Sequence, residues 1–316
     1  MTSLRAPDGA SARTGLVLAL TSVCVLAGTG EARAQDLEPK AYSASPVGAS
    51  FLVLGLSRSS GSILTDPTLP LKDVDAKING VPVAAGYTFG LLGKLALVTV
   101  AVPYAWGDVS GLVFEEARSI TRSGLTDARA KFSVNLVGNP AMGLRGFVKA
   151  PRKTIVGTSL TVTPPTGQYD GAKLINLGTN RWAFKPEIGI AVPKGPWDFD
   201  AYLGAWFFTD NDDFFPGGRT RSQDRVVALQ GHASYTFKPR LGAAIDATWY
   251  EGGGASTDGG EPSGAMNNSR LGATVSFPMG RYQSLKVAYS SGVAVRTGTD
   301  FRTISVGWQF LRFTKM

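Results

Sequence analysis

The chain has 316 residues, 43% of them hydrophobic and 18% charged, and its formal net charge at pH 7 is +8. These values argue against a disordered chain. The single cysteine excludes a disulfide scaffold, and the 39 glycines without a three-residue period exclude collagen, so a globular domain or a membrane barrel remains.

The N-terminus has the features of a secretory signal peptide. Two arginines precede an apolar run over residues 15–28, and the small residues Ala32 and Ala34 are typical of a cleavage site. The run is too short to cross a bilayer as a helix. We therefore expect cleavage after Ala34, which removes the only cysteine, Cys24, and with it any cysteine nucleophile.

Beyond residue 46 the hydrophobic pattern has a period of two. For example, Phe132 and Val134 alternate with Lys131 and Ser133. Successive strand residues point to opposite faces, so one face is apolar and the other is polar. The segments reach about 11–13 residues, enough for a tilted strand to cross a bilayer, whereas strands of soluble sandwiches typically have about 5–6. The predicted strands are 47–59, 76–91, 94–106, 126–137, 154–164, 181–192, 196–209, 224–237, 240–251, 269–279, 284–295 and 301–313.

Two further features favour a transmembrane antiparallel β-barrel over a soluble sandwich. Aromatic residues such as Trp182, Trp249 and Trp308 recur near strand ends, as in the interfacial girdles of membrane barrels. The polar face also carries charged residues, which suits a wet lumen. The predicted fold class is therefore all-β, with about 12 strands. The predicted organisation is a signal peptide at 1–34, a periplasmic N-terminal segment at 35–46 that could plug the lumen, and the barrel at 47–316.

The connections alternate in length. Leu92-Gly93 and Lys238-Pro239 are short, whereas 165–180 and 252–268 are long and polar. Bacterial barrels place short turns in the periplasm and long loops outside. An even strand count then returns both ends of the barrel to the periplasm.

Two connections need separate treatment. Residues 138–153 are long yet fall on the periplasmic side, where we expect a short helix. Residues 107–125 are expected to form an external loop. A hairpin at 109–121 is the alternative, and with one further split strand it leads to fourteen strands instead of twelve.

Residues suited to catalysis or metal binding are scarce. His232 is the only histidine, and on its strand it shares a phase with Gln230 and Ser234, so we predict a lumen-facing structural or pore-lining role. One histidine and no mature cysteine leave only carboxylates as metal ligands, and no phosphate-binding glycine motif occurs. We therefore predict no catalytic residue, no metal and no cofactor. The basic residues do not cluster, so no nucleic-acid partner is indicated.

The inward phase supplies the candidate binding residues. For Arg181, Lys185 and Glu187, one interpretation is a paired charge ladder on the barrel wall, and the other is a binding or selectivity patch. Aromatic residues of the same phase, including Phe208, would contact an aromatic solute. The lumen-lining candidates are Arg129, Lys131, Arg181, Lys185, Glu187, Tyr202, Trp206, His232, Asp246 and Tyr250.

An acidic run follows the strand 196–209. Asp210, Asp212 and Asp213 precede Arg219, Arg221 and Arg225, and these charges are expected to pair at a solvated loop tip. Calcium binding is the alternative for the acidic residues, but the spacing lacks the glycine and glutamate of a hand-type loop. Paired charges on a long loop could also constrict the pore.

Several stretches are more specific than general barrel alternation. They are 37–42, 46–48, 103–106, 133–136, 177–187, 208–215, 219–224, 229–232 and 291–292. Together they resemble the outer-membrane transporter family of the MetA pathway of phenol degradation, over nearly the whole chain after the signal peptide. The resemblance implies an outer-membrane barrel of a Gram-negative bacterium that takes up phenol or related aromatic compounds. It supplies no established binding residues.

Our leading hypothesis is an outer-membrane channel through which small hydrophobic or aromatic compounds diffuse passively. Twelve strands predict a narrow lumen, between filled eight-stranded barrels and open porins. One alternative is a nonspecific small-solute porin, and a third is a structural or adhesive barrel closed to all solutes. A further alternative is an outer-membrane lipid hydrolase, but such an enzyme would carry its histidine on the lipid face, whereas His232 is predicted to point inward.

Two further partners are expected, outer-membrane lipid around the wall and the barrel-assembly machinery during insertion. Trp308 and Phe310 partly match the C-terminal assembly signal of such barrels, although Phe313 is out of phase.

Overall fold

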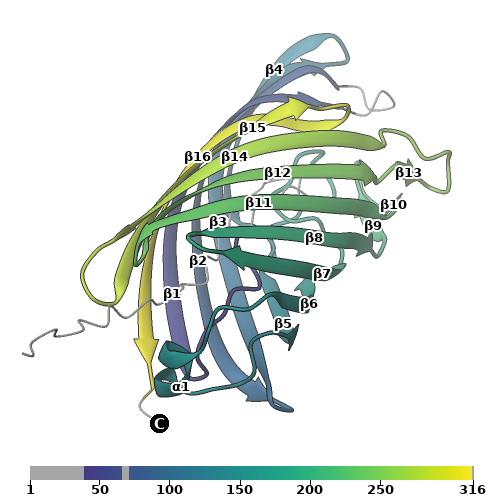
Figure 1. The fold of residues 1–316 in the computed structure, drawn as a ribbon. Coiled ribbons are helices and arrows are strands. Elements are labelled where there is room, and N and C mark those ends of the chain that lie inside the picture. The colour runs from purple at the N-terminus through teal and green to yellow at the C-terminus, as the bar shows by residue number, and fades with distance from the viewer. Residues whose placement is uncertain (1–38, 66–70, 315–316) are drawn as a thin grey trace, which may run out of the picture.

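The chain folds into a closed antiparallel β-barrel (Figure 1). The computed structural model describes residues 39–65 and 71–314, so the predicted signal peptide and its cleavage site lie outside the described residues. Twelve strands form the wall, as predicted, and it closes where the first strand pairs with the last, from Ala49 opposite Phe313 to Leu64 opposite Gly298. The wall strands are β1 (Ala49–Leu64), β2 (Leu71–Leu91), β3 (Lys94–Val113), β4 (Glu116–Leu125) with β5 (Arg129–Val137), β6 (Ile155–Thr163), β7 (Ala183–Lys194), β8 (Trp197–Phe208), β11 (Val226–Lys238), β12 (Leu241–Gly252), β14 (Met266–Pro278), β15 (Gln283–Ala294) and β16 (Gly298–Phe313).

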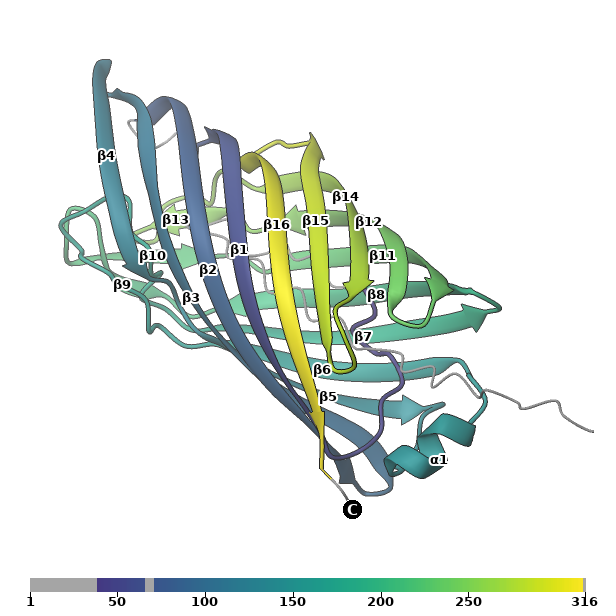
Figure 2. The same cartoon turned by 90° about the vertical axis from the view of Figure 1, so that its left-hand side faces the viewer.

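The strands β4 and β5 share one position in the wall, since both pair with β3. The predicted external loop 107–125 is therefore wrong, because β3 continues to Val113 and turns at Phe114 and Glu115 into β4. Seven of the ten residues of β4 are exposed, and its hairpin with β3 stands at one end of the barrel (Figure 2). A hairpin outside the bilayer needs no apolar face, so its sequence lacks the alternation of the wall. Because β4 and β5 occupy one position, the hairpin does not raise the count to fourteen.

Burial confirms that the strands have two different faces. On β8, Leu203 and Phe207 are 52% and 46% exposed on the outer face, whereas Tyr202 and Trp206 are each 1% exposed inside. Every position around the wall carries large apolar side chains on its outer face. A continuous apolar band of this kind is typical of a barrel surrounded by lipid.

The two ends of the barrel differ. The Leu92-Gly93 turn has both residues at positive φ (48° and 74°), as tight two-residue hairpins require. The strand β16 ends on the same side of the barrel as the helix α1 (Leu144–Lys149) (Figure 1), which occupies the 138–153 connection as predicted. Since short turns face the periplasm, this is the periplasmic end. Within the described ranges, no helix is long and apolar enough to cross a membrane.

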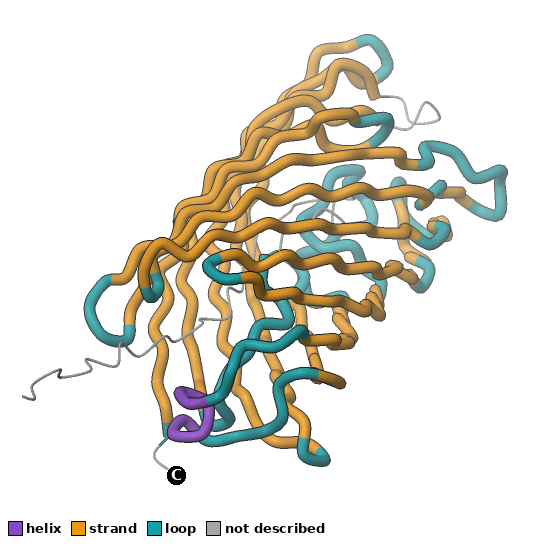
Figure 3. The backbone as a smooth tube through the Cα atoms, viewed as in Figure 1, coloured by secondary structure: helices purple, strands orange, loops and turns teal. Residues whose placement is uncertain are grey.

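The opposite, external end carries a second, small sheet. Its strands come from the two long connections after β8 and β12, so loops far apart in the sequence pair with each other (Figure 3). The three strands are β9 (Asn211–Phe214), β10 (Arg219–Gln223) and β13 (Ala255–Thr257).

Candidate functional site

The N-terminal segment 39–46 enters the lumen and seats Tyr42 against the wall, where its side chain is 1% exposed. The ring lies on Gly157 of β6 and Gly189 of β7, which are paired neighbours. A Cβ atom on either glycine would lie 2.3 Å from a ring atom of Tyr42. Two inward glycines side by side therefore make a flat seat that a larger residue would destroy.

The Tyr42 hydroxyl joins a buried polar network around Glu187. It donates a hydrogen bond to Glu187 Oε1 at 3.0 Å and lies 3.0 Å from Ser159 Oγ. Lys185 Nζ is 2.7 Å from Glu187 Oε2, and Lys131 Nζ is 3.7 Å from Oε1. Of the predicted charge ladder of Arg181, Lys185 and Glu187, the last two thus lie in one cluster, which Lys131 of β5 joins. The contact of this cluster with the N-terminal segment was not predicted.

Basic and aromatic side chains meet on the external side of this cluster. The Arg181 guanidinium lies 4.5 Å from the centroid of the Phe208 ring, and that of Arg129 lies 6.0 Å from the centroid of the Trp206 ring. Trp206 and Tyr250 belong to one buried apolar cluster. These predicted residues do point inward. These contacts place basic and aromatic side chains next to each other in this half of the lumen.

His232 also points inward, as predicted, and its side chain is fully buried. Its Nδ1 lies 2.6 Å from Asp246 Oδ1, and its ring centroid is 5.0 Å from that of Tyr202. Across the described residues, His232 Nε2 has no hydrogen-bond partner, so no serine hydroxyl completes a triad there. The pair is built into the wall, in line with the structural alternative for this histidine.

The acidic loop residues lie on the small external sheet. Arg219 Nε pairs with Asp258 Oδ2 at 2.7 Å, and this hydrogen bond lowers the pKa of Asp258. The expected pairing of Arg219 within the acidic run is therefore wrong, because β10 lies next to β13 and brings Asp258 closer. Asp212 accepts a hydrogen bond from Thr220 Oγ1, and Asp213 accepts one from the backbone of Gly218.

The remaining loop candidates divide by burial. Asp210 is exposed, whereas Arg221 is 5% exposed and its guanidinium lies 4.8 Å from the centroid of the Phe214 ring. Whether this loop constricts the pore stays a prediction. In the part of the chain that the structure describes, no three His, Cys, Asp or Glu side chains form a group that could hold a metal ion.

We expect Glu187→Gln to increase the preference of the pore for anions. The amide keeps the size of the side chain but removes the negative charge beside two lysines, so the local potential becomes more positive. The measurement is the reversal potential of single-channel current in a KCl gradient. Glu251→Gln, the same change on an exposed residue at the external end of β12, is the control. Equal reversal potentials in both variants and the intact protein would contradict this role of Glu187.

Comparisons with known proteins agree with this architecture. Residues 73–310 match the profile of a family described as "Putative MetA-pathway of phenol degradation". The COG4313 outer membrane channel of Pseudomonas putida F1 is 20% identical and has a TM-score of 0.72, with 88% of this chain and 100% of that chain covered. The transport unit of the autotransporter AIDA-I from Escherichia coli is 13% identical, with a TM-score of 0.47, 84% of this chain and 90% of that chain covered. No curated protein matches the sequence. The likeness to the channel establishes the fold, which is the predicted one.

Proposed function

Because the chain belongs to the family described by the MetA pathway of phenol degradation, we propose that it is an outer-membrane channel for small aromatic or hydrophobic compounds, with passive diffusion through a narrow lumen. The observation that carries this proposal is the lumen itself. Tyr202, Trp206 and Tyr250 are buried inside a barrel whose outer face is apolar, and they lie beside hydrogen-bonding and cationic groups. Aromatic walls with a few placed polar groups are typical of sites for small organic molecules.

The segment 39–46 is proposed to narrow this path. Tyr42 fills the seat on Gly157 and Gly189, and the Ala41 backbone donates a hydrogen bond to the Tyr202 hydroxyl at 3.0 Å. Lys40 Nζ is 3.0 Å from Asp198 Oδ2. These contacts support a narrowed lumen, which would exclude hydrated sugars more strongly than flat aromatic molecules. They favour the aromatic channel over the nonspecific porin.

The test is solute uptake by cells whose outer leaflet is lipopolysaccharide, which slows free diffusion of hydrophobic compounds. Cells that contain the protein should accumulate labelled phenol faster than cells without it. The uptake rate of a sugar alcohol of similar size should increase little. An ohmic current through the purified channel, together with an equal increase in the uptake of both solutes by cells, would support the porin instead. No gain for phenol over the control cells would reject the aromatic assignment.

A further inference from the structure

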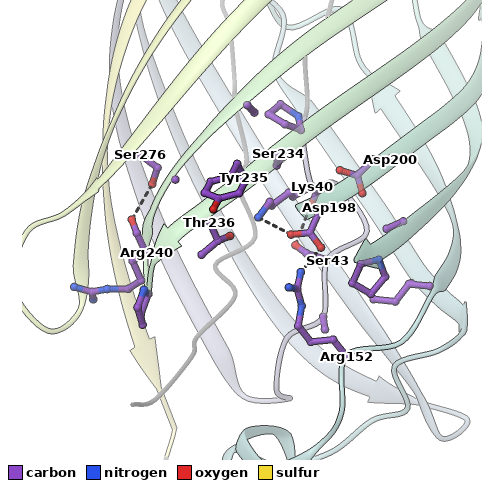
Figure 4. A pocket seen from close by; sticks show the side chains of 18 of the residues that line it. Lys40, Ser43, Arg152, Asp198, Asp200, Ser234, Tyr235, Thr236, Arg240 and Ser276 are labelled. Atoms are coloured by element: carbon purple, nitrogen blue, oxygen red, sulfur yellow. Dashed lines mark hydrogen bonds and ion pairs between the residues drawn. The ribbon is translucent and has the colours of Figure 1, made fainter. Parts of the chain in front are cut away.

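A cavity of about 400 Å³ lies in the periplasmic half of the lumen, next to the N-terminal segment (Figure 4). Sites for small molecules typically measure about 300–1,000 Å³, so this one suits a single aromatic ring with a substituent. At the rim of the cavity, Asp198 forms ion pairs with Lys40 of the N-terminal segment and with Arg152 of the 138–153 connection. The cavity therefore borders both segments that lie between the lumen and the periplasm.

One side of the cavity is a cross-strand row of three inward residues. Ile155 on β6 is opposite Ala191 on β7, and Ala191 is opposite Asp200 on β8. All three are buried and line the cavity. The row therefore offers a small apolar wall that ends on one carboxylate.

Two polar atoms on this wall are buried without a partner. Within the described residues, neither Asp200 Oδ2 nor Ser234 Oγ has a hydrogen bond, although the two residues are 5% and 2% exposed. The Asp200 carboxylate also accepts a hydrogen bond from the backbone of Lys40, so it is held against the N-terminal segment. Burying polar atoms without partners costs free energy, and a ligand that supplies the missing partners would recover it.

We propose that this cavity selects hydroxylated aromatic compounds, a refinement that rests on the proposed channel function. The ring of the solute lies against Ile155 and Ala191, and its hydroxyl donates a hydrogen bond to Asp200 Oδ2. Ser234 Oγ donates to the oxygen of the same hydroxyl. A toluene-like solute fits the space but leaves both polar atoms unpaired.

Binding of phenol and toluene to the purified protein in detergent tests the proposal, with each solute titrated into empty micelles as the blank. The two solutes are nearly equal in size, so the ratio of their affinities measures what the phenol hydroxyl contributes to binding. We expect the intact protein to prefer phenol by about tenfold, because only phenol can donate a hydrogen bond to the Asp200 carboxylate. Asp200→Ala should bring the ratio near one with toluene affinity kept, and Ser234→Ala should lower it less.

Asp200→Asn supplies a second variant of almost unchanged shape, with a neutral acceptor, and should give an intermediate ratio. If every folded variant keeps the phenol preference of the intact protein, the site assignment is wrong while the channel function stands. If the intact protein binds neither solute and cells that contain it gain no phenol uptake, the proposed function itself fails. Thermal unfolding of each variant separates loss of fold from loss of the site.

Discussion

A chain without residues 39–45 should conduct ions and take up small sugars faster than the intact protein, on the order of tenfold. In the intact protein the Tyr42 ring packs inside the lumen against Gly157 and Gly189, and its hydroxyl donates a hydrogen bond to Glu187. Removal of the segment empties this space without touching the wall, because β1 begins at Ala49.

The deletion is placed so that the anchor of the first strand survives. Thr88 Oγ1 donates to the Pro46 carbonyl at 2.7 Å, and Gly48 N donates to the Thr88 carbonyl at 2.9 Å. These bonds are made by residues that remain in the variant. Single-channel conductance and swelling of sugar-loaded liposomes are the two measurements.

Two substitutions distinguish the contribution of the Tyr42 ring to the narrowing of the lumen from that of its hydroxyl. Tyr42→Phe keeps the ring on its glycine seat but loses the bonds to Glu187 and Ser159, so we expect only a small rise in conductance. Tyr42→Ala loses the ring as well, and its conductance should lie between that of the intact protein and that of the deletion variant. A folded deletion variant with unchanged conductance would show that the lumen is closed elsewhere, by the loops.

The wall of the barrel could be predicted because lipid imposes a pattern on every strand. Strand 181–192 illustrates this, since Ile188 and Ile190 must face hydrocarbon while Lys185 and Glu187 face inward. For the same reason the β3–β4 hairpin was only the alternative to the predicted external loop. It stands outside the bilayer, where polar residues satisfy both faces and no period of two remains.

The sequence pattern also could not predict which distant segments contact each other. The inward positions of Gly157 and Gly189 follow from the alternation, but their pairing depends on the register of β6 against β7, which alternation leaves open. Likewise, Arg219 meets Asp258 only because β10 pairs with β13. An inward pair of glycines without side chains is still a usable signal, because it marks a place where another segment can approach closely.

Leu203→Arg should destabilise the protein by about 2–4 kcal/mol when it is folded in phospholipid vesicles. Leu203 lies near the middle of β8 on the outer face, between Ile188 and Leu229 of the neighbouring strands. An arginine there must hold its charge near the centre of the hydrocarbon layer. The measurement is the free energy of unfolding from a guanidinium titration followed by tryptophan fluorescence.

Leu92→Arg is the matched control, because it makes the same change at a residue that is 94% exposed in a periplasmic turn. There the charge stays in water, and the expected cost is about 0–1 kcal/mol. The difference between the two sites decides what surrounds the barrel. Leu203 is already exposed to the surroundings, so in water its replacement by arginine would change stability by no more than about 0.5 kcal/mol. Equal, small effects at both sites would therefore mean that the apolar band does not face lipid, and the channel function would lose its foundation.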